Sequence, residues 1–372
     1  MKILHICTNY TDTQLYQKLN EELQKKGIDQ TYAVPSSYST NCSFELNDNV
    51  KVLKCYPRWL RIVYRIKQSV IRKEIDRKID VESYDIIHAH LLFTNGYLAY
   101  KFKKKYGIPY VVAVRNTDVN DFFKYMKHLR PLGIKILKEA QSIVFLSKAY
   151  YNQMIDKYIP NEFLESFRAK SVILPNGIDN FWLENRTYRR EKLGEEKIDL
   201  VYAGRIDKNK NIGSTLEAMK ILEQRGIITH LDVVGRVEDK SEYEKIMKDE
   251  RVTYHSPMKK EQLINMYRKN SVFVMPSFHE TFGLVYAEAM SQGLPVIYSK
   301  GEGFDGQFED GMVGYSVEPN NPEMIADSIE KIFRQYGFIS GNCSQFVERF
   351  NWERIAERYK ELYKTILIDE VK

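Results

Sequence analysis

Short runs of β-branched and other apolar residues alternate with helical apolar patterns along this 372-residue chain. Strands that alternate with helices in this way predict parallel sheets with helices on both faces. In the first half the expected strands are residues 2–7, 30–34, 86–89, 110–114, 143–146 and 172–174. In the second half they are residues 199–203, 230–234, 252–255, 272–275, 295–297 and 314–317.

The alternation starts again after residues 175–179, whose sequence PNGID is typical of a turn. A polar stretch to residue 197 then indicates a hinge. The sequence therefore predicts an α/β fold of two doubly wound, Rossmann-like domains, residues 1–180 and 181–350, and a C-terminal helix within 351–372. We expect the domains to face each other across a cleft, because open parallel sheets bind ligands at the carboxyl ends of their strands.

The composition is that of a globular protein. Hydrophobic residues make up 43% and charged residues 28% of the chain, close to the average for soluble domains. No apolar run approaches the roughly 20 residues that span a bilayer, and the apolar start of the chain is too short for a signal peptide. Four cysteines without metal-ligand spacing indicate free thiols in a reducing compartment. We therefore expect a cytoplasmic protein.

Residues 276–290, PSFHETFGLVYAEAM, carry the strongest chemical signal. A buried strand ends just before them, and the pattern predicts that a helix begins near Thr281 or Phe282. The amides of Phe282, Gly283 and Leu284 at such a helix start are free to bind an anion, and the helix dipole adds positive potential there. The sequence therefore predicts an anion site in this segment.

Two glutamates, Glu280 and Glu288, belong to the same segment. Eight residues of helix rise about 12 Å, whereas the carboxyl groups of a retaining glycosidase lie about 5–5.5 Å apart. The spacing is too wide for a glycosidase pair. It suits two carboxylates that hold opposite ends of one extended ligand.

The two glutamates and the residues between them, Phe282-Gly283 and Glu288-Ala289-Met290 among them, resemble the signature of retaining glycosyltransferase family 4. The resemblance extends to bacterial cell-surface polysaccharide glycosyltransferases and implies the GT-B fold. It implies that Glu280 contacts the transferred sugar and that Glu288 binds the ribose of the nucleotide. It also implies that the C-terminal helix crosses back to the first domain.

Other segments of the second domain resemble elements of the same family. Residues 204–211, GRIDKNKN, match an element whose arginine and lysine, here Arg205 and Lys210, hold the donor diphosphate. Two cations there would stabilise the charge of a departing nucleoside diphosphate. Gly235 matches a glycine turn near the nucleotide base. Residues 301–306 stand in place of another glycine-rich loop near the donor, and their individual roles stay unassigned.

The chain has no Asp-x-Asp element and no histidine or cysteine cluster with metal-ligand spacing. We therefore expect an enzyme without metal or cofactor. In it, Arg205, Lys210 and the helix amides would stabilise the negative charge of the diphosphate in place of a metal cation.

The first domain departs from the family pattern. Many members carry a Gly-Gly loop after the first strand, whereas this chain has residues 8–13, TNYTDT, in which Asn9 is a candidate contact for the acceptor or a donor phosphate. His88 and His90 alternate in a strand as in the family. A structural role and acceptor binding are both open for these histidines.

Arg115 stands where relatives carry a histidine beside the reacting sugar. An arginine cannot serve as a base, but it can hold a phosphate or an anionic acceptor. We assign Asn116 to the same acceptor side, and we predict that Asp118 contacts the attacking hydroxyl. The predicted catalytic residues are Glu280, Arg205, Lys210 and Asp118.

Residues 51–80 form a basic segment with ten Lys or Arg and three Asp or Glu. Its apolar residues at helical spacing are Trp59, Ile62, Val63, Ile66 and Val70, and its basic residues include Arg58, Arg61, Arg65, Lys67 and Arg72. A basic amphipathic helix with a tryptophan is typical of a membrane surface. The alternative is that the apolar stripe packs on its own domain and the arginines are solvated.

Together these features predict a retaining glycosyltransferase that moves a hexose or N-acetylhexosamine from a nucleoside diphosphate sugar, with a UDP-sugar favoured. The expected acceptor is a glycan or a lipid-linked molecule, and no nucleic acid is expected as a partner. Two alternatives remain open, a nucleotide-sugar epimerase and a non-catalytic subunit that supports an active partner. The altered loop at residues 8–13 and Arg115 motivate the second.

Overall fold

The computed structural model describes residues 1–187 and 197–371 of the chain. The chain divides into two compact units. Unit 1 comprises Met1–Leu146, Tyr150–Asn176 and Trp352–Lys372, and unit 2 comprises Ser147–Ala149 and Gly177–Asn351. Residues 188–196, which make up half of the predicted hinge at residues 180–197, lie outside the described residues.

Unit 1 is built on a parallel sheet of seven strands in the order β3-β2-β1-β4-β5-β6-β7. The strands are β1 (Lys2–Ile6), β2 (Asp29–Ser37), β3 (Val50–Tyr56), β4 (Ile86–Ala89), β5 (Tyr110–Val114), β6 (Ser142–Phe145) and β7 (Ser171–Ile173). The sequence did not predict β3. This strand lies at the sheet edge and exposes Lys51 and Lys54, so it lacks the apolar run of a buried strand.

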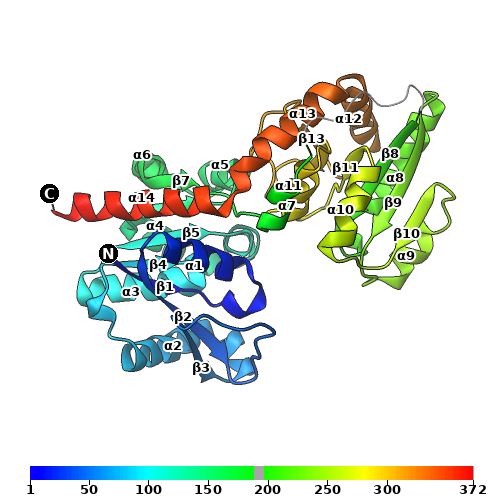
Figure 1. The fold of residues 1–372 in the computed structure, drawn as a ribbon. Helices are drawn as coiled ribbons and strands as arrows, with labels where there is room; N and C mark the ends of the chain where they lie inside the picture. Colours follow the sequence, from blue (N-terminus) through cyan, green and yellow to red (C-terminus); the bar gives the residue numbers. More distant parts are fainter. Residues whose placement is uncertain (188–196, 372) are drawn as a thin grey trace. The chain divides into compact units, whose positions relative to one another are not determined.

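Helices cover both faces of this sheet (Figure 1). One face carries α1 (Leu15–Lys25) and α14 (Trp352–Val371), and the other carries α2 (Tyr64–Lys78), α3 (Tyr97–Tyr106), α4 (Arg130–Glu139), α5 (Lys148–Lys157) and α6 (Asn161–Lys170). Neighbouring strand residues point to opposite faces. Ile3 and Ile86 therefore pack with α1 and α14, whereas Leu4 and Ile87 pack with the helices of the other face.

The helix α14 completes the core of unit 1 although it comes last in the sequence. Its Trp352, Tyr359 and Tyr363 are buried in the cluster that contains Ile3 and Ile86. Full burial of one large apolar side chain contributes about 1.5–3 kcal/mol. Several such side chains on one helix make α14 a structural part of unit 1.

Unit 2 is built on a parallel sheet of six strands in the order β10-β9-β8-β11-β12-β13. The strands are β8 (Lys197–Ala203), β9 (Ile228–Val234), β10 (Val252–His255), β11 (Val272–Val274), β12 (Val296–Ser299) and β13 (Gly314–Val317). The helices are α7 (Asn180–Glu184), α8 (Ile212–Gln224), α9 (Lys240–Ile246), α10 (Lys260–Lys269), α11 (Leu284–Ser291), α12 (Pro322–Arg334) and α13 (Tyr336–Phe346). The prediction of two doubly wound α/β units is confirmed.

The basic segment does not form the single amphipathic helix that its spacing predicted. A short 3₁₀ helix, η2 (Arg58–Ile62), ends before α2 begins at Tyr64. The buried residues of α2 are Gln68, Ile71 and Ile75, and they differ from the predicted stripe. In the described parts of the chain, no helix is long and apolar enough to cross a membrane.

Candidate active site

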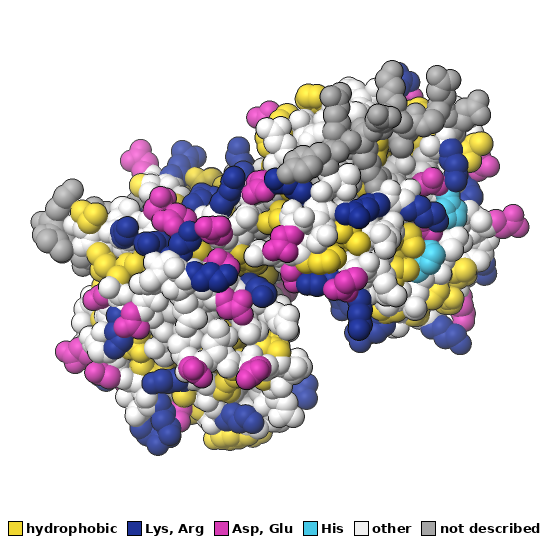
Figure 2. All heavy atoms as spheres, in the orientation of Figure 1, with side chains coloured by type: hydrophobic (Ala, Val, Ile, Leu, Met, Phe, Trp, Pro, Cys, Tyr) yellow, Lys and Arg dark blue, Asp and Glu magenta, His cyan; other side chains and the backbone are white. Residues whose placement is uncertain are grey.

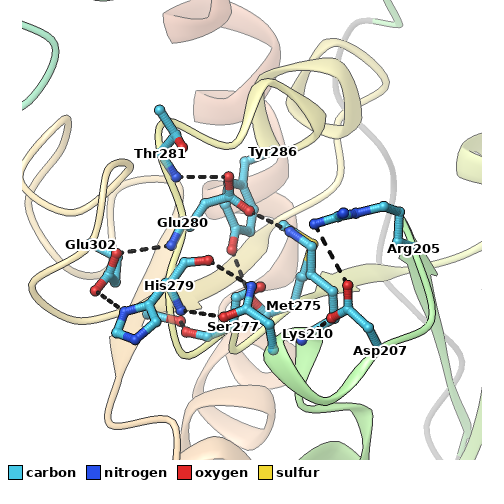
Figure 3. A network of polar contacts seen from close by, with 12 residues as sticks. Arg205, Asp207, Lys210, Met275, Ser277, His279, Glu280, Thr281, Tyr286 and Glu302 are labelled. Atoms are coloured by element: carbon cyan, nitrogen blue, oxygen red, sulfur yellow. Dashed lines mark hydrogen bonds and ion pairs between the residues drawn. The ribbon is translucent and has the colours of Figure 1, made fainter. Parts of the chain in front are cut away.

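Three of the predicted donor residues, Arg205, Lys210 and Glu280, lie beyond the carboxyl ends of two neighbouring strands of unit 2, β8 and β11 (Figure 3). After β8 the chain passes through Arg205 and the 3₁₀ turn η7 (Lys208–Lys210). After β11 it forms the loop that carries Glu280 and leads into α11. The strand order changes direction between β8 and β11, and open α/β sheets bind ligands at such a point.

A short ion pair joins the two segments. The Nζ atom of Lys210 lies 2.6 Å from Oε2 of Glu280, and the two side chains are only 13% and 14% exposed. Arg205 differs, because its side chain is 59% exposed and its closest acidic partner is Asp207, 3.6 Å away. Asp207 also accepts the amide of Lys210 at 3.0 Å and so fixes the η7 turn. The site thus combines one enclosed cation and one exposed cation.

The helix α11 begins at Leu284, later than the predicted start near Thr281 or Phe282. Gly283 precedes it with φ of +74°, and a Cβ atom there would approach the Tyr286 ring to 2.3 Å. Only glycine fits this conformation without strain. The side chain of Phe282 is buried against Phe304 and Phe350, so Phe282 can offer a ligand only its backbone.

The amide groups at the start of α11 are available to an anion. Among the hydrogen bonds of the described residues, none uses the amides of Gly283 and Leu284 as donors. The amide of Thr281, by contrast, donates to Oε1 of Glu280 at 3.0 Å. The amide of Phe282 is likewise not a donor in these hydrogen bonds, so the anion site at the amides of Phe282, Gly283 and Leu284 stays a prediction.

A second carboxylate, Glu302, holds the Glu280 loop from the opposite side. Its Oε2 accepts the amide of Glu280 at 2.8 Å, and its Oε1 lies 3.4 Å from Nδ1 of His279. The carbonyl of Glu280 accepts the amide of Gly303 at 3.0 Å. Asn209 holds the same loop through the carbonyl of His279 at 2.9 Å. Figure 3 shows Glu280 between Lys210 and Glu302.

Glu288 lies about one turn along α11 and has a different environment. Burial raises the pKa of its carboxyl group to about 7, and the negative charge of Asp179 adds to this effect. Lys260 acts in the opposite direction, and its Nζ lies 2.9 Å from Oδ2 of Asp179. Glu288 is therefore a half-buried carboxyl that changes its charge near neutral pH.

Gly235 has a structural reason to be glycine. Its φ is +154°, and a Cβ atom there would lie 1.7 Å from the carbonyl oxygen of Gly204. The absent side chain lets the ends of β8 and β9 approach each other. The next residue, Arg236, forms an ion pair with Glu238.

In unit 1, three histidines form a buried stack. His5 Nδ1 lies 3.0 Å from His90 Nε2, and the rings of His88 and His90 stack with centroids 4.1 Å apart. Burial lowers the pKa of His5 to about 3 and holds those of His88 and His90 well below the usual value. His88 Nδ1 contacts the hydroxyl of Tyr363 on α14 at 2.6 Å.

This histidine stack gives His90 a structural environment. Its ring is fully buried, so it does not offer the acceptor contact that the sequence left open. The three histidines place ligand atoms within 4.8 Å of one another. The ring of His90 is stacked on those of His5 and His88, however, whereas metal ligands converge on one point with their ring edges. We therefore interpret the cluster as packing.

Asp118 is buried, and its carboxylate accepts three backbone amides. The donors are Leu92 at 3.0 Å, Phe93 at 3.1 Å and Arg115 at 2.9 Å. Burial raises the pKa of the carboxyl group to about 6, against the opposing effect of these hydrogen bonds. This geometry does not support the predicted contact with an attacking hydroxyl. It makes Asp118 an anchor between the ends of β4 and β5.

The other predicted acceptor residues differ in accessibility. Arg115 is buried, and its Nε donates to the carbonyl of His90 at 3.4 Å. Asn116 is half-buried and donates to the hydroxyl of Tyr150 at 2.7 Å. Asn9 is exposed at the end of the loop after β1. Of this set, Asn9 and Asn116 can meet an acceptor without rearrangement.

Comparison with known proteins identifies the family. The model described as Glycosyltransferase Family 4 matches residues 15–180, and that described as Glycosyl transferases group 1 matches residues 184–363. The chain is a family 4-like glycosyltransferase of the GT-B fold. It is 25% identical over 315 residues to an uncharacterised glycosyltransferase of Methanocaldococcus jannaschii, an overlap of 78% of this chain and 79% of the relative.

Solved structures agree with this fold. The sucrose-phosphate synthase of Thermosynechococcus elongatus matches with a TM-score of 0.73 at 19% identity over 99% of this chain and 100% of its own. HepE of Anabaena in complex with UDP matches with a TM-score of 0.72 at 14% identity over 98% of this chain and 100% of its own. At sequence identities this low, the two matches show only that this chain has the same fold as these proteins.

The sequence missed one part of the glycosyltransferase site, the clamp that Glu302 and Asn209 form around the Glu280 loop. A signal was present, because Glu302 stands between two glycines in a loop after a buried strand. A charged side chain in such a loop is a candidate for holding the neighbouring strand end. Spacing alone does not say which segment it contacts.

Proposed function

We propose that this glycosyltransferase transfers a hexose or N-acetylhexosamine from a UDP-sugar to a glycan or lipid-linked acceptor, with retention of anomeric configuration. We further propose that the reaction belongs to cell-surface polysaccharide synthesis. The observation that carries the proposal is the Lys210–Glu280 ion pair beside the unused amides at the start of α11. One such site can hold a diphosphate and a sugar at adjacent positions.

The cationic groups suit the donor diphosphate. Arg205 is exposed and can form two parallel hydrogen bonds to phosphate oxygens, and the amides of Gly283 and Leu284 can donate hydrogen bonds to the next phosphate. Lys210 would then stabilise the charge that grows on the leaving diphosphate. In this proposal these groups replace a metal ion. The complex of HepE with UDP supports the choice of nucleotide.

The carboxylates suit the sugar and the ribose. Glu280 is held from both sides, so its oxygens keep fixed positions where the hydroxyls of the transferred sugar would lie. Glu288 would accept hydrogen bonds from the ribose. Retention follows if an oxygen of the leaving diphosphate takes the proton of the acceptor on the same face, a route that the family resemblance supports.

The test is a screen of purified protein against UDP- and other nucleoside diphosphate sugars with simple acceptors. We expect UDP release that depends on the acceptor, an α-linked product from an α-linked donor by NMR, and unchanged rates in the presence of EDTA. Loss of activity with EDTA, restored by Mg²⁺ or Mn²⁺, would refute the metal-free part. Interconversion of donor sugars without transfer would favour an epimerase, and donor binding without turnover would favour a supporting subunit.

A further inference from the structure

The exposed apolar residues at the start of the basic segment are not part of the core. Trp59 is 66% exposed and Ile62 is 89% exposed, and Val63 and Ile66 are also exposed. The core side of α2 is formed by other residues, with Ile71 and Ile75 fully buried. The interpretation that the apolar stripe packs on its own domain is therefore wrong for these four residues.

A second exposed apolar segment belongs to the same unit. Residues 124–128, between η5 (Asp118–Phe123) and α4, are all exposed. Tyr125 is 70% exposed and Met126 is also exposed. The pattern of apolar residues does not predict this segment, because two apolar residues in a loop have no periodicity.

One aromatic contact joins the two segments. Tyr64, the first residue of α2, has its ring 6.4 Å from that of Phe122 and donates its hydroxyl to the carbonyl of Phe93 at 2.7 Å. Tyr64 follows directly after Val63, and Phe122 is three residues before Tyr125. Both exposed segments therefore lie beside the same half-buried contact and belong to one region of unit 1.

The charge of this region has a single sign. Residues 57–67 and 122–130 contain no Asp or Glu and seven Lys or Arg, namely Arg58, Arg61, Arg65, Lys67, Lys124, Lys127 and Arg130. Figure 2 shows hydrophobic and basic side chains next to one another at the end of unit 1 that carries α2 and β3. An anionic partner would thus meet apolar side chains together with positive charge.

We propose that residues 57–67 and 122–130 form one docking surface for an anionic lipid bilayer. The proposal deepens the proposed function, because it rests on a lipid-linked acceptor presented at a membrane. Basic residues bind anionic headgroups, and tryptophan and tyrosine prefer the headgroup level. A partner that offers only phosphates, such as a nucleic acid, would leave Ile62, Ile66 and Met126 in water, so a bilayer fits the surface better.

The native tryptophans provide a direct readout. The sequence contains three, and Trp182 and Trp352 are buried whereas Trp59 is exposed. We expect vesicles of phosphatidylglycerol and phosphatidylcholine to shift the tryptophan emission of the full-length protein to the blue, and vesicles of phosphatidylcholine alone to leave it unchanged. The variant Trp59→Phe should lose the shift and still sediment with the anionic vesicles.

Two sets of variants test the two segments. Each basic residue at an anionic surface contributes about fivefold to binding, so Arg58→Glu, Arg61→Glu and Arg65→Glu together should weaken vesicle binding by at least about 100-fold. Tyr125→Ser with Met126→Ser should weaken it at high salt, where screening leaves the apolar contribution. The matched controls lie in unit 2: Lys240→Glu, Lys245→Glu and Lys248→Glu change the net charge equally, and Phe338→Ser removes an exposed apolar side chain.

Transfer to a soluble acceptor analogue is measured on the same variants. We expect wild-type rates, since none of these residues belongs to the donor site. Vesicle binding as tight in the triple arginine variant as in wild type, or equal losses in the unit 2 controls, would overturn the docking surface. Unchanged vesicle binding after the Tyr125 and Met126 substitutions would show that residues 122–130 are not part of the docking surface. Absent transfer with intact vesicle binding would instead contradict the proposed function alone.

Discussion

The ammonium group of Lys210 and the carboxylate of Glu280 form an enclosed ion pair of 2.6 Å that links the ends of β8 and β11. Each group neutralises the other in the free protein. A donor diphosphate that enters the site brings new negative charge to Lys210 and new hydroxyl donors to Glu280. The ion pair therefore holds both charged groups in position until a bound donor separates them.

Replacement of Lys210 by methionine should lower turnover by about 100- to 1,000-fold at saturating donor, because one preorganised cation is lost where charge develops. Steady-state kinetics measures this. The matched control is Lys208→Met, which removes an exposed cation from the same turn and should change turnover by less than about threefold. The pair also predicts non-additivity, with Lys210→Met and Glu280→Gln together less destabilising than the sum of the single changes.

Glu302 should act on the reaction through Glu280. Glu302→Ala frees the Glu280 loop, and we expect turnover to fall about tenfold or more with a smaller change in the donor KM. Glu302→Gln can still accept the amide of Glu280 and should restore part of the rate. Glu309→Ala, an exposed change in the same region, serves as the control. Equal rates for Glu302→Ala and wild type would contradict the positioning role.

Glu288 should make stability depend on pH near neutrality. The pKa of its carboxyl group is about 7 in the folded protein, against 4.5 for an ordinary glutamate. Between these values the folded protein holds a proton that the unfolded chain has lost, so the ionisation of Glu288 lowers the unfolding free energy as pH rises through this window.

The variant Glu288→Gln cannot ionise. Its melting temperature should therefore match that of wild type near pH 5 and exceed it near pH 8. Its donor KM should rise by about tenfold, because an ionised acceptor of ribose hydroxyls is lost. Glu261→Gln on α10, which is exposed, should show neither effect. A constant difference in melting temperature across this pH range would refute the raised pKa.

Asp118 should behave as a structural residue. An asparagine there has one oxygen in place of two, so at least one of the amides of Leu92, Phe93 and Arg115 loses its acceptor. We expect Asp118→Asn to lower the unfolding free energy by about 1–3 kcal/mol and to leave turnover within about threefold of wild type. Urea denaturation and kinetics measure the two quantities, with exposed Asp121→Asn as the control. A large loss of turnover without loss of stability would restore the predicted catalytic role.

The sequence predicted those features that depend on local pattern. Buried parallel strands are nearly continuous apolar runs, so they were found, and the Glu280 segment has a fixed spacing within one loop and helix. The edge strand β3 was missed because its exposed lysines interrupt the pattern. The start of α11 was predicted too early, because Gly283 adopts a left-handed conformation that depends on the nearby ring of Tyr286.

Contacts between distant segments were the least predictable. Glu302 and Glu280 are 22 positions apart, and Asp118 meets the amide of Leu92 across 26 positions. The residue types were visible, but nothing in their spacing distinguishes a carboxylate that binds a substrate from one that binds backbone amides. The spacing of the apolar residues in the basic segment likewise did not show whether they pack in the core or face the solvent. The structure decides this, because other residues form the buried face of α2.

The position of α14 has a consequence for synthesis on the ribosome. Unit 2 is almost contiguous in sequence, so its residues emerge together and can fold as a group. β1 is translated long before α14, yet its Ile3 packs against Trp352, Tyr359 and Tyr363 of that helix. Until α14 is translated, α1 covers only part of this face of the first sheet, and the part that α14 covers stays open to water and to chaperones. A premature stop just before α14 would therefore damage unit 1, most of which is translated before unit 2.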